Sequence, residues 1–253
     1  MVSFVQRVLQ SGARRLGYRL QSYKSAPYGL DPWRDLERLA RVWNIDLALT
    51  YDVGANVGQT ASLLKKMWHD MQIVCFEPTP ATFDILRQTV SALPGVTAHN
   101  IGLGASAGSF DLFTYPGDSL LNSLSPHSPF TARFASKYDP MVEKISCTVR
   151  TLDEVRRESG VERINLLKID TEGFDLQVLE GAKETLREGR VDFIYLEFNT
   201  ILPQEGIAGG ALAPVAALLQ PLKFNLVSTY TDQLVTTGEF FSGFNALFAR
   251  QQP

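Results

Sequence analysis

The stretch TYDVGANVGQT, from Thr50 to Thr60, decides the fold of this 253-residue chain. The apolar residues 47–49 that precede it are typical of a buried strand, and residues 61–68 carry apolar side chains at helical spacing. The two glycines therefore lie in a tight turn from a strand into a helix. Gly54 lets the backbone turn sharply, and Gly58 lets the helix approach the strand closely. Free N–H groups at the start of such a helix can bind an anion.

The turn departs from the usual dinucleotide-binding pattern at its middle position, which is Asn56 rather than glycine. Asparagine tolerates left-handed backbone geometry better than most residues, so the turn is retained. A second strand, residues 73–76, ends in Glu77, about 20 residues beyond the turn, where a ribose-binding acid belongs. The turn lacks a Gly-Lys-Ser/Thr ending, which argues against a P-loop.

Strand and helix patterns alternate along most of the chain, which predicts parallel strands joined by right-handed crossovers. We therefore predict an α/β fold with a doubly wound, mostly parallel, seven-stranded sheet. Residues 224–229 and 244–248 are expected to form an antiparallel hairpin at the sheet edge. The other expected elements are strands at residues 96–101, 110–115, 145–149, 164–170 and 191–198, and helices from Thr79, at residues 174–186 and at residues 211–222.

Two segments do not fit this alternation. One is interpreted as an insertion within a single domain, residues 47–253, and the other as an extension that precedes this domain. Residues 116–144 are rich in serine, proline and aromatic residues, and a loop this long in a compact domain is usually functional or disordered. We interpret them as a lid or substrate loop, with a mobile surface insertion as the alternative. Residues 1–46 are expected to form an N-terminal, helical, basic extension.

The charge of the chain is unevenly distributed. Residues 1–30 carry +5 with no acidic residue, which leaves −8 for the rest of a chain whose net charge is −3. The acidic body argues against nucleic acid as a partner. Residues 1–25 place apolar side chains among arginines, as a basic amphipathic helix does. Packing of this segment on its own domain is the preferred interpretation, because its apolar face is short. Contact with a membrane surface is the alternative.

Cysteine usage and hydropathy predict a cytoplasmic protein. Cys75 and Cys147 lie in apolar, strand-like runs without metal-ligand spacing, which favours two core thiols in a reducing compartment. No apolar run reaches the roughly 18 residues of a transmembrane helix. The N-terminus is too polar for the hydrophobic region of a signal peptide.

Acidic residues lie at the ends of four expected strands. In an open α/β sheet, ligands bind beyond the carboxyl ends of the strands, near the point where the strand order reverses. Because parallel neighbours lie about 4.8 Å apart, acids at these ends converge on one edge of the sheet. The acids in question are Asp52, Glu77, Asp170, Glu172 and Glu197.

These acids belong to longer sequence blocks, and the combination of these blocks is specific enough to indicate a protein family. The blocks are YDVGANVG at 51–58, FEP at 76–78, RTLD at 150–153, LKIDTEGFD at 167–175, VLEGA at 178–182, and Glu197. Over residues 49–199 the chain resembles the FkbM family of class I S-adenosylmethionine-dependent methyltransferases. The resemblance implies a Rossmann-like sheet and methyl transfer to a hydroxyl oxygen of a sugar, glycan, polyketide or similar metabolite.

S-adenosylmethionine is therefore the expected cofactor, and its chemistry suits the predicted edge. The turn amides can bind its carboxylate tail, and Asp52 can hold its amino group, directly or through the turn. Glu77 can accept hydrogen bonds from both ribose hydroxyls, and Ile101 and Leu103 are candidates to flank the adenine. The predicted cofactor-binding residues are Asp52, Gly54, Asn56, Gly58, Glu77, Ile101 and Asp170.

Methyl transfer to an alcohol requires a group that takes up the hydroxyl proton. The candidates are Asp170, Glu172, Glu197 and His127. Ordinary carboxylates are weak bases, so partial burial would have to raise the pKa of the acid that acts. A divalent metal ion held by clustered acids, which would lower the pKa of the acceptor hydroxyl, is the alternative. No metal ligand is predicted.

Two other functions compete with this interpretation. An NAD-dependent oxidoreductase would share the glycine turn and Glu77, but it does not explain the block at 170–175. A non-catalytic binding module with a degenerate site would act through the basic N-terminus, and the intact site residues argue against it. The expected partner is a small-molecule or glycan acceptor whose identity the sequence does not specify.

Overall fold

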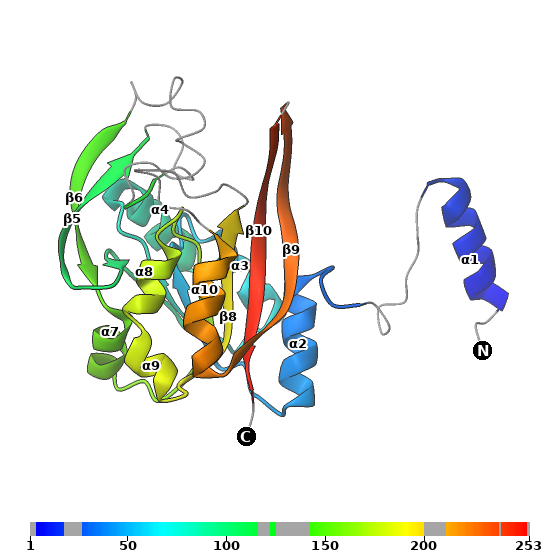
Figure 1. Cartoon of the computed structure of the whole chain (residues 1–253), viewed down its shortest axis with the longest axis horizontal. Helices are drawn as coiled ribbons and strands as arrows, with labels where there is room; N and C mark the ends of the chain where they lie inside the picture. Colours follow the sequence, from blue (N-terminus) through cyan, green and yellow to red (C-terminus); the bar gives the residue numbers. More distant parts are fainter. Residues whose placement is uncertain are drawn as a thin grey trace.

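The computed structural model describes residues 4–17, 27–115, 122–124, 142–199, 211–237 and 239–251. Seven strands form one sheet in the order β3-β2-β1-β7-β8-β10-β9 (Figure 1). The pairs along the first five strands are parallel, and β10 is antiparallel to both of its neighbours. The order reverses between β1 and β7, which confirms the doubly wound, Rossmann-like sheet with an antiparallel edge hairpin. Its strands are β1 (Leu49–Val53), β2 (Gln72–Phe76), β3 (Val96–His99), β7 (Ile164–Ile169), β8 (Val191–Asn199), β9 (Phe224–Thr237) and β10 (Glu239–Arg250).

Helices cover both faces of the sheet because side chains alternate along its buried strands. On β7 and β8, Leu166 and Phe193 pack toward one helical layer, while Leu167 and Ile194 pack toward the other. The first layer contains α2, α3 and α4, and the second contains α7, α8, α9 and α10. The helices are α1 (Phe4–Arg15), α2 (Pro32–Val42), α3 (Gln59–Met67), α4 (Pro80–Val90), α7 (Leu152–Ser159), α8 (Asp175–Glu180), α9 (Lys183–Arg187), α10 (Leu212–Leu219) and the short η4 (Gln220–Leu222).

Helix α2 is part of the core of this domain. Its Leu36 and Ala40 are buried in the hydrophobic cluster that α3 and α4 form with the sheet. Its buried Asp35 accepts a hydrogen bond from the hydroxyl of Tyr230 on β9, at 2.9 Å. This packing places α2 with the sheet, whereas the sequence assigned it to the extension predicted for residues 1–46.

The single helix predicted for residues 174–186 is wrong, because two short helices occupy this segment. The break lies at Gly181, where a Cβ would lie 2.0 Å from the carbonyl oxygen of Gly104. The carboxylate of Asp153 then receives the backbone N–H of Thr185, at 2.8 Å, in the first turn of α9. Close backbone packing and a side-chain cap from α7 therefore interrupt the helix.

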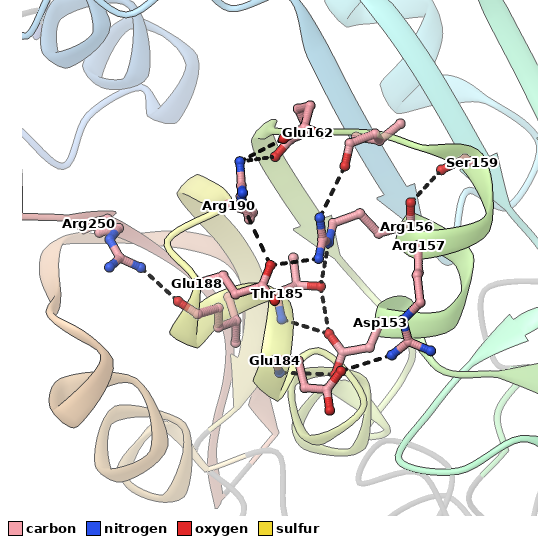
Figure 2. A network of polar contacts seen from close by, with 12 residues as sticks. Asp153, Arg156, Arg157, Ser159, Glu162, Glu184, Thr185, Glu188, Arg190 and Arg250 are labelled. Carbon is pink, nitrogen blue, oxygen red and sulfur yellow. Dashed lines mark hydrogen bonds and ion pairs between the residues drawn. The ribbon is translucent and has the colours of Figure 1, made fainter.

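Polar contacts tie α7 to α9 on the outer surface (Figure 2). The guanidinium of Arg156 donates to the hydroxyl of Thr185, at 3.0 Å, and to Glu188, at 2.8 Å. Arg157 donates to Glu184, at 2.9 Å. The RTLD block thus contributes structure: its aspartate caps α9 and its helix carries these arginines.

A second, smaller sheet lies beside the first. The strand predicted for residues 96–101 ends early, at His99, because the side chain of Asn100 donates to the carbonyl of Glu77, at 2.9 Å. The chain then enters the second sheet, whose order is β4-β6-β5. Its strands are β4 (Gly102–Leu103), β5 (Gly108–Thr114) and β6 (Glu143–Arg150).

The insertion predicted at residues 116–144 connects β5 to β6. Residues 122–124 and 142–144 of it are described, and Ser123 pairs with Phe113 on β5. The rest of the insertion lies outside the described residues, so its role as a lid stays a prediction.

The edge hairpin is longer than the sequence predicted. The last pair between β10 and β8 joins Gly243 to Asn199, whereas β9 and β10 continue to pair as far as Thr237 and Glu239. The hairpin therefore extends past the carboxyl end of β8, as Figure 1 shows.

Candidate active site

The strand register places the ends of four parallel strands side by side. Val53 pairs with both Phe76 and Ile169, and Ile169 pairs with Leu196. The residues that follow these positions lie along one edge of the sheet, at the point where the strand order reverses. They are Gly54, Glu77, Asp170 and Glu197.

The glycine turn depends on backbone conformations that side chains disfavour. Gly54 has a φ of +73°, and a Cβ there would lie 1.8 Å from the carbonyl oxygen of Asp170. Gly58 has a φ of +90° and precedes α3, and Asn56 has a φ of +48°. The turn therefore retains left-handed geometry at its non-glycine position, and Gly54 brings the ends of β1 and β7 together.

The amides of this turn are used differently from the prediction. The N–H groups of residues 54–55 both donate to the carbonyl of Phe76, at 3.0 Å, and the N–H of Asn56 donates to Glu77 Oε2, at 3.1 Å. These three donors hold β2 against the turn. An anion would meet the first turn of α3 instead, where helix N–H groups lack intrahelical partners and where Gln59 lines the pocket.

Asp52 lies beneath the turn, away from the pocket lining. It is fully buried and pairs in register with Lys168 on β7, whose Nζ lies 3.0 Å from Asp52 Oδ1. The same ammonium donates to the carbonyl of Gly54, at 3.2 Å, and lies 3.4 Å from Asp170 Oδ2. Burial opposes the charge on Lys168, but the two carboxylates outweigh it and raise the pKa of Lys168. The sequence predicted that Asp52 holds the amino group of the cofactor either directly or through the turn. This geometry favours an action through the turn.

Glu77 is a buried carboxylate that lines the pocket. Its two oxygens accept the N–H groups of Asn56, at 3.1 Å, and Thr79, at 2.9 Å. Burial raises the pKa of Glu77, and these hydrogen bonds oppose the rise. A carboxylate accepts more than one hydrogen bond per oxygen, so Glu77 retains capacity for two ligand hydroxyls.

The pocket above this edge has a polar floor and an apolar side. Strand-end residues and the Asp170–Glu172 turn form its floor, and the small sheet closes it with Leu103 and Leu112. Ile101 packs against the core, and its side chain is not in the described lining. The lining consists of Val53, Gly54, Asn56, Gln59, Phe76, Glu77, Pro78, Thr79, Gly102, Leu103, Leu112, Asn122, Ser123, Leu124, Asp170, Thr171 and Glu172.

Three carboxylates converge at the β7–β8 end of this edge. One oxygen from each of Asp170, Glu172 and Glu197 lies within 4.8 Å of the others. Burial, followed by the charges of Glu172 and Asp170, raises the pKa of Glu197 well above that of an ordinary glutamate. Neighbouring Asp175 is also buried, which together with the charge of Asp170 raises its pKa to about 7. Glu197 and Asp175 therefore retain protons to a higher pH than ordinary carboxylates do.

The turn that carries Glu172 is held by the described part of the insertion. Glu172 has a φ of +53°, which is unusual for a residue with a side chain, and Gly173 follows with a φ of +93°. Ser123, which is buried, donates its hydroxyl to the carbonyl of Glu172, at 2.8 Å. The segment 122–124 thus lines the pocket and fixes the acidic turn. His127 lies outside the described residues, and its predicted role stays a prediction.

A comparison with known protein families bears directly on these blocks. Residues 52–226 match the family described as Methyltransferase FkbM domain. The chain belongs to the FkbM methyltransferase family. The match covers the glycine turn, Glu77 and the whole acidic edge.

Three curated relatives of this FkbM chain are named as methyltransferases. "Methyltransferase sdnD" of Sordaria araneosa is 34% identical over 154 residues, which are 53% of this chain and 60% of that protein. "2-O-methyltransferase NoeI" of Sinorhizobium fredii is 28% identical, covering 71% of this chain and 73% of that protein. "Hexuronic acid methyltransferase AglP" of Haloferax volcanii is 30% identical, covering 59% and 55%. The chain thus spans little more than half the length of some relatives.

Sequence reasoning missed part of the pocket of this FkbM chain. Leu112 comes from a strand of the small sheet, and Leu124 comes from the insertion. The alternating pattern of residues 110–115 indicated a strand but not which face meets a ligand. The composition around Asn122, rich in serine, proline and aromatic residues, was the available signal for a substrate loop.

Proposed function

We propose that this chain is an S-adenosylmethionine-dependent O-methyltransferase that acts on a hydroxyl of a sugar, glycan or polyketide-like metabolite. The observation that carries the proposal is the arrangement of the pocket: Glu77 lies on one side of the glycine turn and the acid cluster on the other. Family membership supports methyl transfer. The name of one relative, a 2-O-methyltransferase, supports transfer to oxygen, and that of another, a hexuronic acid methyltransferase, supports a sugar-like acceptor.

The residues of the pocket fit the proposed cofactor. The buried Glu77 can still accept hydrogen bonds from the two hydroxyls of a ribose. Leu103, Leu112 and Leu124 form an apolar wall against which the adenine ring can pack. Asp170 and the start of α3 lie where a charged amino-acid tail would meet opposite charges. When bound, S-adenosylmethionine supplies a methyl group on a sulfonium, and transfer of that methyl to an alcohol oxygen releases one proton.

In this proposal the acid cluster takes up that proton. Glu197 holds a proton above the pH range of an ordinary glutamate, while Glu172 and Asp170 supply the negative charge beside it. An ionised member can therefore accept the hydroxyl proton of an acceptor that enters over β7 and β8. The enclosing pocket aligns the reactants and excludes water. A divalent cation held by the same three oxygens would instead acidify the acceptor hydroxyl.

Donor choice is the first test of this proposal. Titration calorimetry should show that the protein binds S-adenosylmethionine and does not bind NAD. Glu77→Ala should weaken donor binding by on the order of 1.5–3 kcal/mol, roughly tenfold to 150-fold, since charge-assisted hydrogen bonds are lost. Glu37→Ala, which removes an exposed glutamate on α2, is the control and should leave donor affinity unchanged.

The same titrations can overturn the proposal. Binding of NAD without binding of S-adenosylmethionine would make the chain an oxidoreductase of similar fold. Failure to bind either molecule would favour a non-catalytic module. Unchanged donor affinity in folded Glu77→Ala protein would remove Glu77 from the cofactor site.

A further inference from the structure

Helix α1 carries an apolar face that is open to solvent. Its Val8 and Leu9 are 55% and 57% exposed, and Leu16, directly after the helix, is 76% exposed. An exposed apolar stripe on a helix indicates a surface that binds something.

The charge around this stripe indicates the chemical class of its binding partner. Arg14 and Arg15 end the helix and are exposed, and residues 1–30 carry five cations and no acid. The matching partner is apolar in its interior and negative at its surface. A lipid bilayer with anionic headgroups has both properties.

The length of the helix determines how it would meet a bilayer. Twelve residues make a helix of about 18 Å, shorter than the roughly 30 Å hydrocarbon core of a membrane. Within the described ranges, no helix has the length and apolarity needed to cross a bilayer. A short basic amphipathic helix lies in the plane of the interface instead.

We propose that α1 is an interfacial anchor that docks this chain on anionic membrane surfaces. The sequence alone favoured packing of residues 1–25 on their own domain, and the exposure of Val8, Leu9 and Leu16 reverses that preference. The proposal concerns binding alone, so it stands or falls independently of methyl transfer.

Vesicle flotation with the full chain tests the proposal. The protein should bind vesicles of phosphatidylcholine mixed with phosphatidylglycerol and should not bind pure phosphatidylcholine vesicles. Binding should fall at about 1 M salt, where the Debye length is about 3 Å. The double variant Arg14→Gln/Arg15→Gln should lower the partition coefficient about 30-fold, about fivefold per cation. Val8→Ser/Leu9→Ser should lower it roughly tenfold or more.

Two matched variants control for loss of charge and of apolar surface elsewhere. Lys66→Gln/Arg187→Gln removes two exposed cations, and Val42→Ser/Ile85→Ser removes two exposed aliphatic side chains. Both should bind the mixed vesicles as the parent chain does, and all four variants should unfold at the parent temperature.

Three outcomes would overturn the proposal. The first is failure of the parent chain to bind mixed vesicles. The second is equal binding by the α1 variants and the parent chain. The third is a fall in oligomer size in the α1 variants without a change in vesicle binding, which would make the face a contact between copies.

Discussion

Among the predicted catalytic residues, Glu197 has a pKa that its surroundings raise well above that of an ordinary glutamate. It lies beside Asp170, two residues before the end of β8, because the register of β7 and β8 pairs Ile169 with Leu196. Burial and the neighbouring negative charges disfavour its ionised form, so its pKa is raised. A carboxyl group with a raised pKa is suited to acid–base chemistry, but its ionisation lowers the folding stability.

Glu197→Gln should separate these two effects. Turnover should fall about a hundredfold to ten-thousandfold, the usual cost of losing an acid–base group, while donor affinity stays unchanged. In the parent protein, turnover should fall as the pH drops below the raised pKa of Glu197, because the base is then protonated. Rate measurements against pH, with donor titrations for both proteins, check this.

The folding stability of the same variant provides the control. The native state of the parent holds a proton on Glu197 at pH values where the unfolded chain has lost it, so parent stability should fall as pH rises through that window. Glutamine does not titrate, so the fall should shrink in the variant. Near-normal turnover, or loss of donor binding together with turnover, would contradict the assignment of Glu197.

At the scale of elements, sequence patterns predicted the ends of strands well but predicted the break within a helical segment poorly. Glu77 and Asp170 follow their strands as expected, since polar residues after apolar runs mark strand ends. Helix 174–186 was predicted whole because its apolar periodicity continues through Gly181. The contact that breaks it, with the carbonyl of Gly104, joins residues far apart in the sequence. Local periodicity carries no information about such a contact.

The sequence predicted a lid or substrate loop that includes residues 122–124, but it did not predict where these residues lie in the structure. Ser123→Ala removes the hydroxyl that holds the carbonyl of Glu172, so the left-handed turn of Glu172 should lose definition. We expect a loss of about 1 kcal/mol of folding stability. Turnover should fall roughly tenfold to a hundredfold, because small misplacements of reacting groups are costly. Donor affinity should change much less.

A comparison with Ser109→Ala checks this prediction. Ser109 forms an exposed hydroxyl pair with Ser146 in the small sheet, and neither residue lines the pocket. Thermal melts, donor titrations and steady-state rates should show normal turnover for this control. Equal turnover in both serine variants would show that Ser123 only stabilises the fold.

For the whole molecule, alternating strands and helices were sufficient to predict the doubly wound sheet and its edge hairpin. The place of α2 was not predictable in this way, because its amphipathic pattern suits an extension as well as a core helix. Tertiary contacts through Leu36 and Ala40 decide the matter. The pocket likewise combines the main sheet, the small sheet and the insertion. The sequence identified residues of the first contribution, and from the small sheet it identified Leu103 but not Leu112.

Methyl transfer itself tests the central claim most directly. The protein should be incubated with methyl-labelled S-adenosylmethionine and a panel of sugars, uronic acids and polyketide alcohols, with and without a chelator. Mass spectrometry should find label on a hydroxyl oxygen of at least one acceptor, and Glu197→Gln should abolish most of it. Loss of activity on chelation, with recovery on adding magnesium or manganese, would assign the acid cluster to a metal. Donor binding without label on any oxygen, or label on nitrogen or carbon, would contradict the proposed O-methyltransferase.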